Sequence, residues 1–142
     1  MKIRSFVPSD EDAVVALWVE AGLTRPWNDP RKDIRRKSTV QSELFLVAET
    51  TRDGVESIVG AVMAGFDGHR GWINYLAVAH SARGTGAGRL LVAAAEQSLE
   101  ALGCPKVQLQ IRPDNADVVG FYAHLGYEPY EVVDMGKRLI AD

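Results

Sequence analysis

The sequence has little cysteine and no long apolar run. Its only cysteine, Cys104, excludes an internal disulfide and a cysteine-rich metal site, and we expect no bound metal. No stretch approaches the roughly 18 apolar residues that a membrane-spanning helix needs, and residues 1–6 contain no signal-peptide core. These absences predict a cytoplasmic protein without a membrane partner.

An excess of positive charge is also lacking. Lys and Arg total 16 and Asp and Glu total 19, which gives a net charge of −3. Because nucleic-acid binding depends on a basic surface, we expect no nucleic-acid partner. With 142 residues, 46% of them apolar, the chain has the size and composition of one globular domain, and we expect residues 1–142 to form it.

Strand-like and helix-like segments alternate along the chain. We expect strands at 2–7, 44–50, 58–66, 72–78 and 106–111, and helices at 10–21, 31–39, 86–102 and 116–125. Segments 127–134 and 137–140 are expected to form a last antiparallel pair around Gly136. This order predicts an α/β (α+β) fold, with a mixed sheet and helices on both faces.

A glycine-rich turn between a strand and a long helix carries the strongest functional signal. Its glycines stand at alternate positions, 84, 86 and 88. Glycine lets a ligand approach the backbone closely, and the first amides of a helix lack internal partners, so the turn suits a phosphate or pyrophosphate. Arg83 and Arg89 add positive charge. The alternative is a flexible loop before a glycine-tolerant helix start.

Two common phosphate motifs do not fit this turn. A P-loop needs Lys and then Ser or Thr after its glycines, but Arg89 and Leu90 occupy those positions. A Rossmann fingerprint needs an early βαβ unit and a different glycine spacing.

Two motifs together resemble the GNAT superfamily of acyl-CoA-dependent N-acetyltransferases. Arg83-Gly84-Thr85-Gly86-Ala87-Gly88 matches the family pattern Arg/Gln-x-x-Gly-x-Gly/Ala, after a strand, 73–78, like the family's central one. Asn115, followed by Tyr122-x-x-x-Gly126-Tyr127, resembles its second signature. Segments 25–30, 67–71, 103–106 and 136–140 look closest to the YpeA group of acetyltransferases. The resemblance implies the GNAT fold, a mostly antiparallel, splayed sheet flanked by helices on both faces.

The resemblance also implies acetyl-CoA as cofactor and assigns its contacts. Backbone groups of the central strand would pair with the pantetheine arm, at Leu76, Ala77 and Val78. The following turn would hold the pyrophosphate, through Arg83, Gly84, Thr85, Gly86, Ala87, Gly88 and Arg89. Asn115 would hydrogen-bond the cofactor arm, although a helix cap is an equal alternative for it.

The family pattern suggests two catalytic groups but leaves the base open. Tyr122 matches the tyrosine that protonates the departing thiolate, the alternative being a core tyrosine beside Phe121. The Val78 amide is the candidate donor to the oxyanion. Several branches carry a Glu in the central strand where this chain has Asn74 and Tyr75, and neither is a base at neutral pH.

Four residues are candidates for the acceptor site. Trp27 lies in a region that lines the acceptor site in the family, and Arg25 beside it could bind a carboxylate. Asp67 and His69, in the turn before the central strand, are the nearest candidate bases. The alternatives are a loop-anchoring tryptophan and a solvated turn. The basic helix 31–37 could attract an acidic peptide or the adenosine 3′-phosphate of the cofactor, but we expect it to be a solvated face.

These observations predict an N-acetyltransferase that moves an acetyl group from acetyl-CoA to a primary amine by direct attack. The acceptor is a small molecule or a protein N-terminus, and the family resemblance also allows a homodimer. Because the strand carboxylate is missing, an acyl-CoA-binding regulatory module without efficient transfer remains the alternative. A nucleotide-phosphate-binding domain is the third possibility.

Overall fold

A five-stranded sheet in the order β1-β2-β3-β4-β5 forms the centre of the computed structural model, which describes residues 1–142. The strands are β1 (Lys2–Ser5), β2 (Phe45–Arg52), β3 (Val55–Phe66), β4 (Gly71–Val78) and β5 (Val107–Gln108). All neighbours are antiparallel except β4 and β5, which are parallel. The predicted mixed, mostly antiparallel sheet is therefore confirmed.

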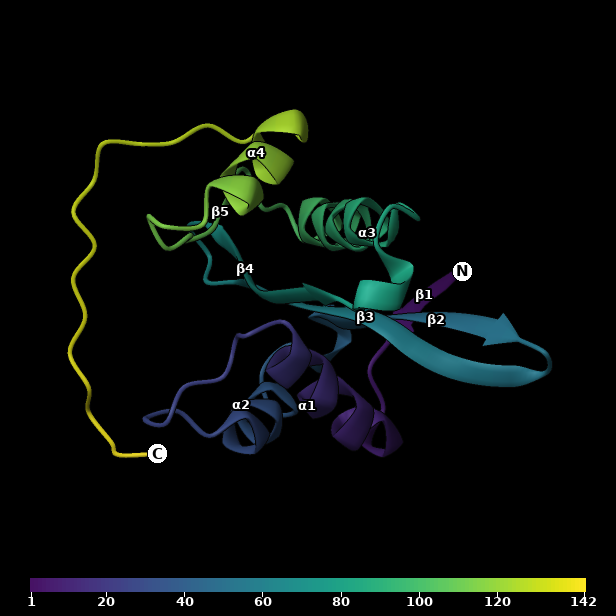
Figure 1. Ribbon diagram of the computed structural model, residues 1–142. Helices are drawn as coiled ribbons and strands as arrows, with labels where there is room; N and C mark the ends of the chain where they lie inside the picture. The colour runs from purple at the N-terminus through teal and green to yellow at the C-terminus, as the bar shows by residue number, and fades with distance from the viewer.

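Helices cover both faces of this sheet (Figure 1). One face carries α1 (Glu11–Glu20) and α2 (Pro30–Lys37), and the other carries α3 (Ala87–Ala101) and α4 (Ala116–His124). Short 3₁₀ turns occur at Pro8–Asp10, Ser42–Leu44 and His80–Ala82. None of the helices combines the length and hydropathy needed to cross a membrane.

The two faces bury separate cores because successive strand residues point to opposite sides. Phe45 and Val47 of β2 pack with Trp18 of α1, whereas Leu46 packs with Leu91 of α3. Trp18 is fully buried and its ring stacks on Phe45 at 6.2 Å. The strand is therefore apolar on both faces, as expected of a sheet covered by helices on both sides.

A bulge in β4 changes which face its side chains reach. The register moves from Met63 opposite Asn74 to Ala61 opposite Ala77, so β4 has one extra residue, and Tyr75 has φ +55°. Ile73 consequently packs in the α3-side core, while Ala77, four residues on, packs in the α1-side core. In a regular strand these two residues would share a face.

The sheet opens between β4 and β5. Only two residue pairs join these strands, Gly71 with Val107 and Trp72 with Gln108. The predicted strand 106–111 is thus shorter than expected, and beyond Trp72 this edge of β4 faces no strand. This is the splayed sheet that the family resemblance implied.

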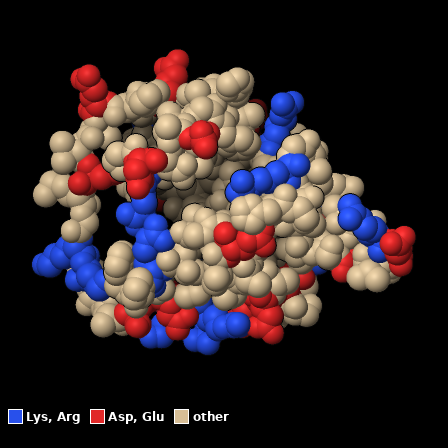
Figure 2. All heavy atoms as spheres, viewed as in Figure 1, with Lys and Arg blue, Asp and Glu red and all other residues tan.

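The predicted C-terminal strand pair is wrong. Residues 128–141 are exposed and extended, and they belong to no strand. The segment runs from the end of α4 to α2, outside the edge strand β5. Open space separates much of it from the rest of the protein (Figures 1 and 2). A two-stranded hairpin has little stability without a sheet edge or an apolar face, and β5, with two paired residues, offers only a short edge.

Candidate active site

The glycine turn presents unpaired backbone amides at the start of α3. The first helical hydrogen bond runs from Leu90 N–H to the Gly86 carbonyl, at 3.0 Å. The amides of Ala87, Gly88 and Arg89 therefore have no backbone partner within the chain. Arg83 is exposed beside the turn and, like Arg89, forms no ion pair. The turn is thus a positively polarised site that fits a pyrophosphate.

Two glycines of the turn have different physical roles. Gly86 has φ +86°, a conformation that other residues rarely adopt, and open space lies where its Cβ would stand. A Cβ at Gly88 would come within 3.2 Å of the Phe121 ring and 3.6 Å of Val78. Gly86 therefore shapes the turn, while Gly88 lets α3 approach the end of β4 and α4, so the two motifs meet in space.

The Val78 amide points to the open edge of β4. Ala79 N–H donates to the Val59 carbonyl on β3, at 2.8 Å. Because successive strand amides point to opposite edges, Val78 N–H points away from β3, toward the gap beside β5. Leu76 and Val78 pack their side chains into the α3-side core, and Ala77 packs into the α1-side core.

The side chain of Asn115 makes no capping hydrogen bond. Asn115 precedes α4, and its carbonyl accepts from Val119 N–H at 3.3 Å. The amide group forms no hydrogen bond within the chain and lies exposed. The alternative role as a helix cap is therefore not seen here, and the amide is free for a ligand.

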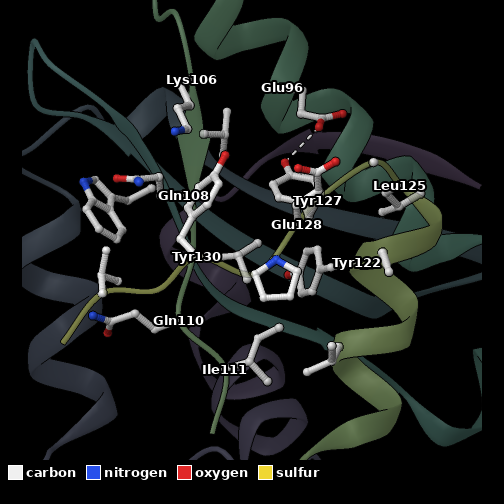
Figure 3. A pocket seen from close by; sticks show the side chains of 18 of the residues that line it. Glu96, Lys106, Gln108, Gln110, Ile111, Tyr122, Leu125, Tyr127, Glu128 and Tyr130 are labelled. Carbon is white, nitrogen blue, oxygen red and sulfur yellow. Dashed lines mark hydrogen bonds between the residues drawn. The ribbon is translucent and has the colours of Figure 1, made fainter. Parts of the chain in front are cut away.

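A cavity of about 540 Å³ lies between β5, α4 and residues 126–134, with Tyr122 in its wall (Figure 3). Tyr122 is 5% exposed, and its ring meets Phe121 and Tyr127 edge-on, at 5.1 and 5.3 Å. Tyr127 donates its hydroxyl hydrogen to Glu96 at 2.8 Å, whereas the Tyr122 hydroxyl has no partner within the chain. Burial raises the pKa of Tyr122, so this phenol keeps its proton at neutral pH.

A second cavity, of about 390 Å³, lies on the other face, between α2 and the bulge of β4. Asn74 and Tyr75 both line it, because the bulge turns both side chains to this side. Tyr75 stacks on Trp18 with ring centroids 4.0 Å apart and donates its hydroxyl hydrogen to Asp33, at 2.6 Å. Burial and the hydrogen bond to Asp33 raise the pKa of Tyr75.

Asn28 completes this polar cluster. Its amide nitrogen donates to Tyr75 at 2.9 Å and to Asp33 at 2.6 Å, and Arg36 pairs with the other oxygen of Asp33 at 2.5 Å. Sequence reasoning missed this cluster, because Asp33 stands within a basic segment and Tyr75 within an apolar strand. The signal that marks it is Asp33 itself, the one acidic residue among the basic side chains of segment 31–37.

The basic helix is a solvated face only in part, because Arg35 and Arg36 are exposed whereas Lys37 is half-buried. Arg31 pairs with Glu11 and Asp12, each at 2.8 Å, and Lys37 Nζ donates to the Ala64 carbonyl at 2.5 Å. Burial lowers the pKa of the half-buried Lys37. Figure 2 shows acidic and basic side chains interspersed over α1 and α2, so this surface has no field of one sign.

The four residues predicted for the acceptor site line neither of these cavities. Trp27 is 58% exposed, and Arg25 donates to the Gly22 and Thr24 carbonyls of its own loop. Asp67 accepts from the amides of His69 and Arg70 and from the Trp72 indole, and the two amide bonds lower its pKa most. The structure thus gives Asp67 a turn-forming role, and acceptor binding by Arg25, Trp27, Asp67 and His69 stays a prediction.

Comparisons with known proteins agree with this geometry. Residues 12–127 match the acetyltransferase (GNAT) family. An acetyltransferase of Pectobacterium atrosepticum is 47% identical over 142 residues, which cover 100% of this chain and 98% of that protein. Glucosamine-6-phosphate N-acetyltransferase of Arabidopsis thaliana superposes with a TM-score of 0.67 at 25% identity, covering 98% of each chain. Naa20 of Chaetomium thermophilum, solved with a bisubstrate analogue, gives a TM-score of 0.72 at 24% identity over 88% of this chain and 70% of that one.

The fold, the glycine turn and these matches define an acetyltransferase. The chain belongs to the GNAT family and is an N-acetyltransferase.

Proposed function

We propose that the protein uses acetyl-CoA to acetylate a primary amine, by direct attack of the amine in a ternary complex. The observation that carries this proposal is the convergence of three features: the unpaired amides of the glycine turn, the Val78 amide at the open edge of β4, and the free phenol of Tyr122. Gly88 of the turn packs closely against Phe121, the neighbour of Tyr122, and against Val78, so the three features lie next to one another.

The chain's own groups suit the cofactor. The unpaired amides at the start of α3, with Arg83 and Arg89, would hold the pyrophosphate. Leu76, Ala77 and Val78 would pair with the pantetheine arm along the open edge of β4, and Asn115 would donate to it from the start of α4. When bound, acetyl-CoA supplies an activated acyl carbon that a neutral amine can attack.

Two groups then act on the charges that develop. Val78 N–H would donate to the acyl oxygen as it gains negative charge. Tyr122 would donate its phenolic proton to the departing thiolate, and burial favours this role because it keeps the phenol protonated. No carboxylate of β4 is available as base, so the amine must lose its proton elsewhere.

The test measures release of the free thiol of coenzyme A with a panel of primary amines, among them polyamines, amino acids and short peptides. Binding of acetyl-CoA is followed separately by calorimetry. We expect amine-dependent thiol release well above hydrolysis in buffer. Tight cofactor binding without thiol release for any amine would instead support the regulatory module.

A further inference from the structure

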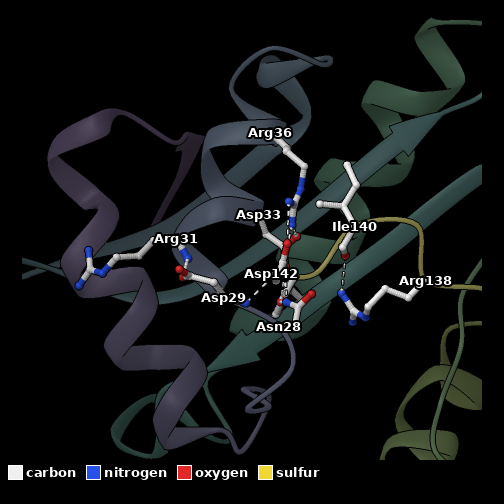
Figure 4. Close-up of polar contacts among 9 residues, drawn as sticks. Asn28, Asp29, Arg31, Asp33, Arg36, Arg138, Ile140 and Asp142 are labelled. Atoms are coloured by element: carbon white, nitrogen blue, oxygen red, sulfur yellow. Dashed lines mark hydrogen bonds and ion pairs between the residues drawn. The ribbon is translucent and has the colours of Figure 1, made fainter.

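The side chain of Asp142 is buried at the end of an exposed segment. Residues 128–141 are all exposed, whereas the Asp142 side chain is 5% exposed. Its two carboxylate oxygens face Arg36, with Oδ1 3.1 Å from Nη1 and Oδ2 3.1 Å from Nη2 (Figure 4). Asp29 N–H donates to Oδ2 at 3.3 Å. The segment thus reaches across to α2 and places one carboxylate in a defined site.

The groups around this carboxylate form a receptor for an anion. The guanidinium of Arg36 can donate two parallel hydrogen bonds to one carboxylate. This bidentate geometry is the strongest for an arginine–carboxylate pair. The Asp29 amide lies at the start of α2, where the helix dipole favours negative charge. The hydrogen bond with Arg36 lowers the pKa of Asp142, and Lys32 adds to this effect. The ionised form of Asp142 is therefore favoured by Arg36, Lys32 and the Asp29 amide.

This receptor borders the cavity between α2 and the bulge of β4. Arg36 lines that cavity and also pairs with Asp33, which holds the Tyr75 hydroxyl. Tyr75 lies three residues before Val78 on β4, where we place the acyl oxygen. An acceptor in this cavity would have its amine near β4 and its other end near Arg36.

We propose that Arg36 and the Asp29 amide form a subsite for a carboxylate carried by the acceptor amine, and that Asp142 occupies this subsite in the free protein. The acceptor class is then a small amino acid rather than a polyamine. A carboxylate, with one negative charge, suits the subsite better than a phosphate, which can carry two. Asp33 already shares the guanidinium of Arg36, so its charge repels the more highly charged anion more strongly. This inference rests on the proposed acetylation of an amine.

The test compares L-amino acids with their α-amides as acceptors, in matched pairs that differ only in the carboxylate. We expect kcat/KM for the acids to exceed that for the amides by about 10- to 100-fold. Asp142→Ala should lower the KM for the acids by about 3- to 10-fold, because it removes an internal competitor. The KM for the amides should stay unchanged.

Two variants make the test specific. Arg36→Gln should abolish the preference for acids over amides. Glu131→Ala is the matched control, because it also removes one negative charge from the exposed segment but forms no ion pair, and it should behave as the wild type. Equal kcat/KM for acids and amides, or turnover restricted to amines without a carboxylate, would overturn the subsite and leave the proposed acetylation intact.

A binding measurement separates the subsite from catalysis. The Arg36 Nε–H resonance, assigned by its absence in Arg36→Gln, is followed by NMR while the same L-amino acids are added in the presence of coenzyme A. We expect it to shift at lower amino-acid concentration in Asp142→Ala than in the wild type. A shift without thiol release for any amine would refute the acetylation and retain the subsite. An Arg36 resonance that stays fixed in Asp142→Ala would overturn the subsite.

Discussion

Replacing Tyr122 with Phe separates the chemistry of its hydroxyl from the packing of its ring. The ring contacts Phe121 and Tyr127 edge-on in the α3-side core, and Phe preserves both contacts. The hydroxyl has no partner within the chain, so its removal leaves no buried donor or acceptor unpaired. We therefore expect the free energy of unfolding to change by less than about 1 kcal/mol.

The expected effect on catalysis is much larger. A positioned general acid typically accelerates a reaction by about 10²- to 10⁴-fold, which corresponds to roughly 3–5 kcal/mol of transition-state stabilisation. Because Tyr122 keeps its proton at neutral pH, its full donor capacity is available. We expect kcat to fall by about 100-fold or more, with little change in the KM for acetyl-CoA, since the contact acts on the departing thiolate.

The assay follows thiol release under single-turnover conditions, so that chemistry rather than product release is measured. Tyr127→Phe is the matched control, because its hydroxyl bonds Glu96 at 2.8 Å. This control should lower the free energy of unfolding by about 1–2 kcal/mol and leave the chemical step nearly unchanged. A single-turnover rate within about threefold of wild type for Tyr122→Phe would refute the acid role and make Tyr122 a core residue only.

Three further changes test the turn, the pH dependence and the second cavity. Gly86→Val should abolish acetyl-CoA binding in calorimetry, whereas Gly54→Val, which strains a remote turn at φ +76°, should lose stability but keep binding. Because the hydrogen bond from Arg4 lowers the pKa of Asp10, the unfolded state binds more protons, so the free energy of unfolding should decrease as pH falls below about 4. Asp10→Asn should flatten this dependence in urea unfolding. Tyr75→Phe should raise the KM for the amine more than that for acetyl-CoA and lower stability by about 1–2 kcal/mol.

Local signals in the sequence were sufficient for most elements of the fold. The turn around Asp53 and Gly54, both with positive φ, joins β2 and β3, and an Asp-Gly pair between two strand-like segments is typical of a hairpin. Asp29 accepts from Arg31 N–H and caps α2, with Pro30 at its first position. These features depend on neighbouring residues, so periodicity and turn chemistry reveal them.

Features that depend on distant residues escaped prediction. Segment 128–141 contains residues that favour strands, such as Val132, Val133 and Ile140, but a strand also needs a partner edge, which one chain segment cannot show. The contact of Asp142 with Arg36 joins residues 106 positions apart. The same limit applies to the proposed acceptor cavity. Trp27 is a candidate because of its residue type and loop position, whereas this cavity depends on the contact of Asp33 with Tyr75, 42 positions away.

The bulge in β4 lets one strand serve both the α2-side cavity and the open edge beside β5. Without the extra residue, side-chain alternation would turn Tyr75 toward α3, and its hydroxyl could not reach Asp33. A positive φ at a residue other than glycine costs about 1–2 kcal/mol. Stacking on Trp18 and the hydrogen bond to Asp33 offset this cost. Asn74 and Tyr75 can therefore line the α2-side cavity while Val78, three residues beyond Tyr75, still points its amide to the open edge beside β5. One local irregularity thus places the wall of the proposed acceptor cavity and the proposed oxyanion donor on the same strand, three residues apart.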